Sequence, residues 1–506
     1  MANILNMSRL LFLLLIFSIV FAAGCNLSAF DTTPRVLSYE VSVEPEMSRI
    51  RVTGTIDHLR KGSYYFALPR TQGFPPAHFV KYVEFSDANG RLNAEITDLG
   101  EWLIATSGPS VSFTYHINLQ QELKYQGEAW GGSTTQLEGE TAFLNGSLSF
   151  MVPLIGNIDA PVNLSWDVPD NWNVVTPWTA NVDTMKVPSH YALVNNYYVA
   201  YKEGSISSQR IRDVDLNTVW LGEGDINAYP EAAMAIRKVV EAGMDFFGED
   251  SSKEGITLIL RDSNAQNRFR ASTEANSIEF NFKKGMSFDR IWKNYRDGFL
   301  RLLAHEIMHT WDRREVQEAT AYLHVREWGP NTCWLREGFT EYFAMLNLYK
   351  AGMRDLPTFV NTMQAIAESG KKNNPQGSYS LTNACGLFFE NDEALNFIYS
   401  GGAALAFQLD LELRNATNGE KTLPALMRGY MSEYRYKEKT IASFVEAWNG
   451  YAPAALHNLD ARLQSGSSTD LSAQLNTMGL ELKPARQGVR YWFVPHQSVF
   501  KKHFSL

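Results

Sequence analysis

Residues 300–312 read LRLLAHEIMHTWD, and the predictions of fold and function below depend on this stretch. His305 and His309 lie four residues apart, so on a helix their imidazoles project from one face about one turn apart. Two histidines at this spacing can bind one metal ion together. The apolar residues form a stripe with helical periodicity on the other side, which comprises Leu300, Leu303, Ala304, Ile307, Met308 and Trp311.

Glu306 completes the pattern His-Glu-x-x-His, in which a carboxylate beside a metal can take a proton from a water molecule. A catalytic zinc ion keeps three protein ligands and one position for water, so a third ligand is needed. The best candidate is Glu337, in the second helical segment WLREGFTEY at residues 334–342. Gly338 in this segment predicts a close approach to the first helix. Glu341, one turn further on, is either a hydrogen-bond acceptor for a metal-bound histidine or an exposed helix charge.

These two segments resemble the gluzincins, zinc peptidases of clan MA that carry an HExxH helix and a glutamate ligand on the next helix. HTWD at residues 309–312 and WLREGFT at residues 334–340 are most similar to the glycyl aminopeptidase family, with its patterns HExxHxWN and WxxEGFT. The aminopeptidase N family is more distant, because its spacer between the second histidine and the glutamate has about eighteen residues. Here the spacer, Thr310 to Arg336, has 27 residues.

The resemblance implies one zinc ion per chain, held by His305, His309 and Glu337 in a thermolysin-like catalytic domain, with Glu306 as the catalytic base. YSGGA at residues 399–403 resembles the family's Y-x-K-G segment, which opens a helix matched here by residues 405–414. Tyr399 is then either the hydrogen-bond donor to the transition state or an ordinary packed tyrosine. Asp312 and Gly401 depart from the family's Asn and Lys at the corresponding positions.

The stretch RASTEANS at residues 270–277 only loosely matches the family's glycine-rich G-L-E-H segment along the substrate cleft. Glu274 would bind the free amino group of a substrate, and the alternative is a surface charge. The next apolar run, Ile278 to Phe282, is predicted to be an edge strand beside which an extended peptide could lie.

Two cysteines and a further histidine lie near the predicted site. Cys333 and Cys385 either pair in an oxidising compartment and brace the zinc site, or remain two free buried thiols. His324, within the spacer, is interpreted as a solvated loop residue.

The N-terminus has the pattern of a secretory signal. Arg9 precedes an apolar run from Leu10 to Ala23 that is too short to span a bilayer comfortably. The following AAGC, residues 22–25, resembles the lipobox of bacterial lipoproteins, in which the cysteine is lipidated. We therefore expect removal of residues 1–24 and a lipid anchor on Cys25 at the bacterial cell envelope, in the outer membrane of a Gram-negative host. The alternative is a plain signal peptide with an incidental cysteine.

The composition excludes some classes of protein. The chain has 506 residues, which favours two to four packed units. Its 46 basic and 55 acidic residues give a net charge of −9, so nothing suggests nucleic acid as a partner. Its 3 cysteines are too few for a disulfide-rich scaffold.

The periodicity predicts a multidomain α+β protein. Alternating apolar residues, turns such as DANG at residues 87–90 and the absence of a convincing helix predict an antiparallel β domain over residues 35–205. The polar stretch Lys202 to Gln209 is the predicted boundary. The other predicted units are a lipidated linker (25–34), the catalytic domain (206–350), a helical domain (351–485) and a tail (486–506). MGLEL at residues 478–482 resembles the segment before the family's PDZ domain, but the two dozen residues that follow are too few for such a domain.

Together these observations predict a zinc metallopeptidase that hydrolyses peptides or proteins, of aminopeptidase type. A zinc endopeptidase would use the same centre. A catalytically silent homologue that acts as an envelope binding protein is the alternative of another class.

Overall fold

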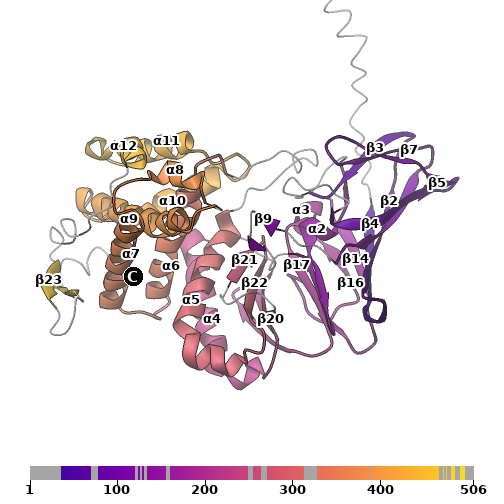
Figure 1. The fold of residues 1–506 in the computed structure, drawn as a ribbon, viewed down its shortest axis with the longest axis horizontal. Coiled ribbons are helices and arrows are strands. Elements are labelled where there is room, and N and C mark those ends of the chain that lie inside the picture. The colour runs from indigo at the N-terminus through magenta and orange to yellow at the C-terminus, as the bar shows by residue number, and fades with distance from the viewer. Residues whose placement is uncertain are drawn as a thin grey trace, which may run out of the picture.

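The computed structural model describes residues 36–495, apart from 70–77, 120–123, 126–127, 130–133, 155–159, 249–254, 264–269, 313–327, 389, 466–470, 472–474, 476–479 and 485–490. A β domain lies at one end of the molecule, a mixed sheet at its centre and helices at the other end (Figure 1). None of the helices in the described part of the chain has both the length and the apolar character to cross a membrane.

The longest strands of the β domain include two in which every second side chain is buried. β2 (Arg49–Asp57) and β8 (Ser110–Ile117) show this alternation along their whole length, as expected for strands that pack on one face. Its largest sheet has the order β16 (Thr184–Val187), β14 (Val162–Asp167), β1 (Leu37–Glu44), β2, β8, β4 (Val80–Asp87) and β5 (Gly90–Leu92). The second sheet has the order β13 (Val152–Pro153), β3 (Gly62–Ala67), β7 (Trp102–Thr106) and β6 (Ala94–Ile96), and it shares an apolar core with the first.

A third sheet of this domain faces the centre of the molecule. Its order is β11 (Gln136–Glu138), β12 (Thr141–Asn145), β17 (Tyr197–Tyr201) and β15 (Asn173–Val175). The domain also contains the pair β9 (Lys124–Tyr125) and β10 (Glu128–Ala129), and the short helices α2 (Gly146–Ser149) and α3 (His190–Val194). The prediction of strands without helices was therefore wrong at α2 and α3, which are too short to produce a helical period.

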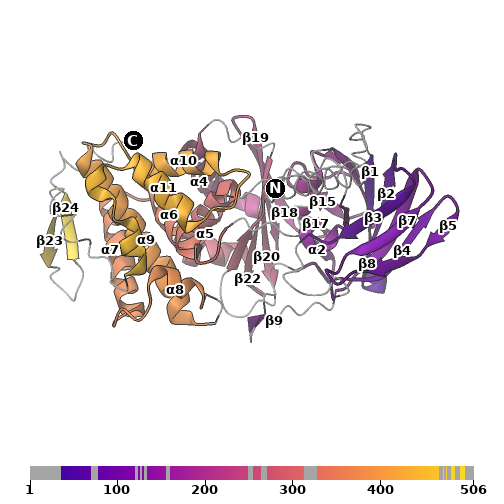
Figure 2. The ribbon, with the colours of Figure 1, turned by 90° about the horizontal axis from the view of Figure 1, so that it is seen from above.

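The central sheet has five strands in the order β18 (Ser205–Ile211), β19 (Val214–Leu221), β20 (Gly255–Ser263), β22 (Ser277–Lys283) and β21 (Arg270–Thr273). β19, β20 and β22 are parallel, and the two edge strands are antiparallel to their neighbours. One face packs against helices, and residues such as Ile259 on the other face pack against Tyr197 and Val199 of β17. The sheet is thus buried on both faces between the β domain and the helices (Figure 2).

Two sequence predictions need correction here. Ile278 to Phe282 lies in β22, which is an interior strand, and the edge strand next to it is β21. Residues 205–209, predicted as part of a polar boundary, belong to β18. The short polar stretch 202–204 separates the two sheets. In both cases the local pattern was ambiguous because strand order depends on pairing between distant segments.

The helical part begins with α4 (Pro230–Phe247), whose Pro230 stands at the first turn, where a missing backbone N–H costs nothing. It continues with α5 (Phe288–Asp312), a π-helical turn η5 (Trp334–Gly338), α6 (Phe339–Lys350), α7 (Leu356–Asn373), α8 (Leu381–Cys385), α9 (Asp392–Ala416), α10 (Leu423–Glu433), α11 (Ile441–Tyr451) and α12 (Leu459–Gln464). The hairpin of β23 (Leu480–Pro484) and β24 (Tyr491–Pro495) lies beside α7 (Figure 2). One apolar core joins residues on both sides of position 350, from Ile211 to Leu475.

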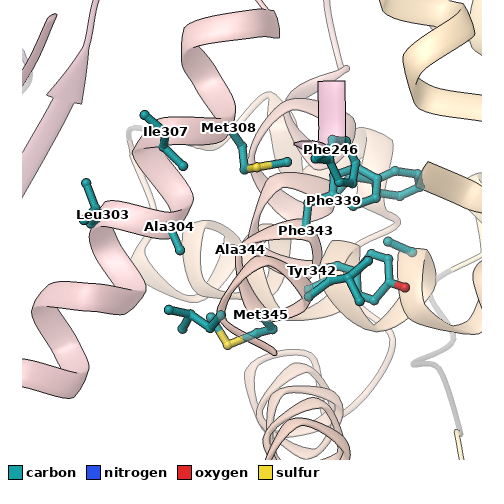
Figure 3. Close-up of a cluster of buried hydrophobic side chains, with 14 of the residues drawn as sticks. Phe246, Leu303, Ala304, Ile307, Met308, Phe339, Tyr342, Phe343, Ala344 and Met345 are labelled. Atoms are coloured by element: carbon teal, nitrogen blue, oxygen red, sulfur yellow. The ribbon is translucent and has the colours of Figure 1, made fainter. Parts of the chain in front are cut away.

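The apolar stripe of α5 packs against α6. Leu303, Ala304, Ile307 and Met308 are buried, and they face Phe343 and its neighbours on α6 (Figure 3). Fully burying an aliphatic side chain of this size contributes about 1.5–3 kcal/mol, so these contacts fix the rotation of α5 about its axis. That rotation sends the polar face of α5 toward the predicted metal site.

Candidate metal centre

The two histidines of α5 meet as the sequence predicted. His305 and His309 are each 5% exposed, and their Nε2 atoms lie 3.1 Å apart. The Oε2 atom of Glu337 lies 3.4 Å from Nε2 of His305 and 3.5 Å from Nε2 of His309. The three residues form a group that can hold a metal ion.

The size of this triangle tests whether zinc fits. Zinc bonds to nitrogen and oxygen ligands are about 2.0–2.1 Å long, so two ligand atoms of a tetrahedral site lie about 3.3–3.4 Å apart. The observed separations of 3.1, 3.4 and 3.5 Å bracket that value. Two imidazoles, one carboxylate and one position left for water are also the donors that a catalytic zinc site uses.

Glu337 lies in a π-helical turn, a local widening of the helix that occurs frequently at functional sites. Cys333, directly before this turn, forms a disulfide with Cys385 of α8, with a Cα–Cα distance of 5.6 Å. This settles the alternative left open by the sequence in favour of pairing. The disulfide therefore links the residue just before this turn, four positions before Glu337, covalently to α8.

Gly338 permits a close approach, but to a different helix from the one predicted. A Cβ atom on Gly338 would lie 2.6 Å from Cα of Gly402 and 2.7 Å from the carbonyl oxygen of Ile398, both on α9. The expectation that Gly338 faces the first helix was wrong. The contact instead places Glu337 beside α9, and so beside Tyr399.

Glu341 contacts the ring nitrogen of His305 that does not face the other two residues of the group. Its Oε2 atom lies 3.2 Å from Nδ1 of His305, and its Oε1 atom accepts a hydrogen bond of 2.6 Å from Nε of Arg301. Glu341 is 6% exposed, so the alternative of a solvated helix charge does not hold. A carboxylate in this position orients the imidazole ring and directs its Nε2 atom toward a metal.

The electrostatics of the cluster favour ionised carboxylates. Burial by itself lowers the pKa of His305, but its hydrogen bonds to Glu337 and Glu341 raise that pKa to about 10. Burial raises the pKa of Glu337, but the charge of His309 and hydrogen bonds from both histidines bring it well below its usual value. Burial acts against ionisation of Glu341 too, but His305 and Arg301 lower its pKa. A metal cation at Nε2 of His305 would take the place of the proton there.

Tyr399 lies at this centre. Its hydroxyl donates a hydrogen bond of 2.9 Å to Oε2 of Glu337, and its ring centroid is 5.7 Å from that of His305. Burial and the charge of Glu337 raise the pKa of Tyr399 well above its usual value, so it remains a donor. It lies within α9 rather than just before a helix, because α9 begins at Asp392 and includes the predicted segment 405–414.

Glu306 has a partner that sequence reasoning missed. The hydroxyl of Thr273, at the end of β21, donates a hydrogen bond of 2.6 Å to Oε2 of Glu306. Glu306 is 7% exposed, on the same helix as both histidines. Nothing in the sequence pointed to this threonine, since threonine is common and the strand that carries it was not recognised.

Glu274 follows Thr273 directly. It is 6% exposed, so the alternative of a surface charge is excluded. Its backbone N–H donates to the carbonyl oxygen of Ser277 in the turn between β21 and β22. The structure thus places it next to the residue that contacts Glu306. Cys25, the rest of the N-terminal signal pattern and His324 lie outside the described residues.

Two family models match parts of this chain. The model of the M61 glycyl aminopeptidase domain matches residues 298–394, and that of the peptidase M61 N-terminal domain matches residues 38–200. No curated protein sequence matches the chain.

Solved structures share the fold. An aminopeptidase N family protein from Idiomarina loihiensis has a TM-score of 0.70 at 17% identity, over 89% of this chain and 79% of that one. An M1 zinc metallopeptidase from Deinococcus radiodurans has a TM-score of 0.53 at 13% identity, over 88% and 97%. A variant of the Deinococcus enzyme bound to a Tyr-Ser-Ala substrate has the same TM-score and identity, over 87% and 96%.

The two family matches together cover just over half of the chain, and the first of them contains the HExxH motif, Glu337 and Glu341. The α+β fold, with a β domain in front of the metal-binding helices, is the one expected from the sequence. The chain therefore belongs to the M61 glycyl aminopeptidase family of metallopeptidases.

Proposed function

We propose that this protein is a zinc-dependent aminopeptidase that removes residues from the free N-termini of peptides at the bacterial cell envelope. The observation that carries the proposal is the triangle of His305, His309 and Glu337, with the carboxylate of Glu306 held beside it. A catalytically silent homologue is disfavoured because all three ligands and the base are present. The structural relative from Deinococcus that holds Tyr-Ser-Ala supports a peptide as the substrate.

His305, His309 and Glu337 would hold the zinc ion, which when bound lowers the pKa of a water molecule to about 7 and polarises a carbonyl. Glu306 accepts the proton of the attacking water and later passes it to the leaving amine. Tyr399 donates from a hydroxyl that is kept protonated by its high pKa, so it can stabilise the negative charge that develops on the carbonyl oxygen. Glu341 and Arg301 hold the ring of His305 in place.

Selection of free N-termini needs a buried carboxylate that pairs with the substrate's ammonium group. Glu274 is buried and follows the last residue of the edge strand β21. An extended peptide can add to such an edge by backbone hydrogen bonds. We propose Glu274 as the partner of the ammonium group.

A cleavage profile of a mixed peptide library, read by mass spectrometry, tests the activity. Wild type should shorten peptides from their free N-termini and leave N-acetylated peptides intact. Glu306→Gln should retain zinc and lose nearly all turnover, because an amide cannot accept the proton. Internal cleavage of acetylated and free peptides at equal rates would identify an endopeptidase, and peptide binding without any cleavage would identify a silent homologue.

Glu274→Ala separates amine recognition from the chemistry. Loss of a buried charged partner costs about 2–5 kcal/mol, roughly 30-fold to several thousand-fold in kcat/KM. We expect this loss on free peptides with unchanged zinc content. Glu203→Ala, which removes an exposed glutamate, is the matched control and should leave kcat/KM unchanged. An indifferent Glu274→Ala would remove this residue from the amine site.

The location rests on the lipobox-like stretch that ends at Cys25. We propose that a lipid anchor on Cys25 attaches the protein to the membrane. Wild type should then sediment with membranes, and Cys25→Ser should not, because stable attachment depends on the acyl chains. A wild-type protein that stays in the supernatant would leave a plain signal peptide.

A further inference from the structure

The hydroxyl of Thr273 is directed at the carboxylate of Glu306. Its Oγ1 atom lies 2.6 Å from Oε2 of Glu306 and 3.1 Å from the backbone carbonyl oxygen of the same residue. Thr273 is 4% exposed. Charge-assisted O–H···O⁻ hydrogen bonds have about this length, and they are the stronger class of hydrogen bond.

We propose that Thr273 is a positioning residue that orients the general base Glu306 for proton transfer, an inference that rests on the proposed peptidase function. Within the described part of the chain, no hydrogen bond is made to Oε1 of Glu306. Thr273 therefore engages one carboxylate oxygen and leaves the other to accept a proton. Without this bond the glutamate side chain would sample several rotamers, which lowers the fraction in the productive geometry.

The strand β21 holds Thr273 firmly enough for this task. Thr273 pairs with Ile278 of β22, and the preceding residue Ser272 lies 2.6 Å from the hydroxyl of Tyr197 in the β domain. Successive side chains of a strand point to opposite faces, so Ser272 anchors the strand to the β domain while Thr273 reaches α5. The β-branched side chain of threonine also has few accessible χ1 rotamers.

This placement couples the base to the proposed peptide-binding edge. β21 is the edge strand along which an extended substrate would lie, and its last residue contacts Glu306. A peptide that pairs with β21 would therefore restrict the same backbone that orients the base. If the Thr273 hydroxyl had no role beyond satisfying its own hydrogen-bonding capacity, the backbone carbonyl oxygen of Glu306 would be a sufficient acceptor. The hydroxyl also contacts the carboxylate of Glu306.

Two substitutions separate the hydroxyl from the shape of the side chain. Thr273→Val keeps the branched shape and removes the hydroxyl, and Thr273→Ser keeps the hydroxyl and removes the methyl group. Thr218→Val is the matched control, because it removes the hydroxyl of another buried threonine of the same sheet, on β19, whose Oγ1 atom has no hydrogen-bond partner among the described residues.

Crystal structures of wild type and the two Thr273 variants provide the readout that does not depend on activity. We expect Oε2 of Glu306 within hydrogen-bond distance of residue 273 in wild type and in Thr273→Ser. In Thr273→Val the carboxylate should rotate away or occupy several orientations. An unchanged Glu306 carboxylate in Thr273→Val would overturn the proposal.

Kinetics with glycyl-4-nitroanilide and alanyl-4-nitroanilide test the consequence. Thr273→Val should lower kcat about 10- to 100-fold, since a small misplacement of a catalytic group has effects of this size. KM should stay within about twofold, because no substrate contact is lost. Zinc content should be unchanged, Thr273→Ser should restore most of kcat, and Thr218→Val should leave kcat at the wild-type level.

A wild-type kcat in Thr273→Val, or an equal loss in Thr218→Val, would overturn the positioning role. Failure of the proposed function gives a different result, since wild type would then hydrolyse neither compound. In that case the crystallographic comparison alone decides whether Thr273 orients Glu306.

Discussion

Gly338 lies directly against Gly402, at the point where the π-helical turn with Glu337 crosses α9. A Cβ atom on Gly402 would lie 2.8 Å from Cα of Gly338 and 2.9 Å from the carbonyl oxygen of Trp334. Backbone atoms cannot move aside as the end of a flexible side chain can, so both positions require glycine. This crossing brings the hydroxyl of Tyr399 to 2.9 Å from the ligand oxygen of Glu337.

The substitution Gly402→Ala should therefore push η5 away from α9. We expect a loss of about 1–3 kcal/mol in the free energy of unfolding, typical of overpacking, together with weaker zinc binding. Gly429→Ala on α10 is the matched control, because a Cβ there meets no atom within 4 Å. It should stabilise the protein by about 0.4–1 kcal/mol in the same denaturation experiment. Equal effects of the two substitutions would show that the crossing does not need its glycines.

Removal of Glu341 should weaken metal binding without removing a ligand. Glu341→Ala frees the ring of His305 and leaves Arg301 without its carboxylate, and the loss of such a partner lowers metal affinity about 10- to 100-fold. Zinc competition with a chromophoric chelator measures this change. Glu368→Ala, at an exposed position on α7, should leave the zinc affinity unaltered. A wild-type affinity in Glu341→Ala would contradict the role of Glu341.

The disulfide between Cys333 and Cys385 should stabilise the fold by lowering the conformational entropy of the unfolded chain. It closes a loop with a sequence separation of 52, for which the chain-entropy relation gives about 4 kcal/mol. The variant Cys333→Ala, Cys385→Ala should therefore unfold at lower denaturant concentration than wild type, with a difference of about 2–4 kcal/mol. Wild type under reducing conditions should approach the same curve. Coincident curves for oxidised wild type and the double variant would refute this prediction.

Local sequence patterns predicted which three side chains the structure brings together as a group that can hold a metal ion, namely His305, His309 and Glu337. The period of the stripe on α5 identified the helix and its polar face, and the next helical segment supplied Glu337. Metal ligands on one helix are set by fixed spacing, so a single sequence is enough to find them. The segment that carries Glu337 was recognised as helical, but its π-helical turn was not foreseen.

Features that depend on pairing between distant segments were missed or misplaced. The sequence prediction placed the edge of the sheet at β22, whereas β21 is the edge strand. An apolar run does not reveal which strands lie beside it. The partner of Gly338 lies on α9, far along the chain, and was assigned to the wrong helix. Thr273 escaped notice for the same reason, since its contact with Glu306 exists only once β21 and α5 are packed together.

Buried His190 predicts a pH dependence of stability. Burial lowers its pKa to about 4, and its Nδ1 atom has no hydrogen-bond partner among the described residues. The unfolded chain, with a histidine pKa of about 6.5, binds a proton between these values while the folded protein does not. Stability contributed by neutral His190 is therefore complete above pH of about 6.5 and falls as the pH drops toward about 4, by about 3 kcal/mol in total.

Urea denaturation between pH 4 and pH 8 measures this effect as the difference between wild type and His190→Asn. The variant should lose less stability than wild type on acidification across this window, because asparagine does not titrate. Parallel curves for wild type and His190→Asn would contradict the assignment of a depressed pKa to His190.

The metal content of purified protein tests the central claim most directly, namely that His305, His309 and Glu337 form a zinc site. Elemental analysis should find one zinc ion per chain in wild type, because two imidazoles and one carboxylate on packed helices form a preformed site. The variant His305→Ala, His309→Ala should lose the zinc, whereas His457→Ala should keep it. Absence of zinc from wild type under metal-replete conditions, or an undiminished zinc content in the double variant, would contradict the account.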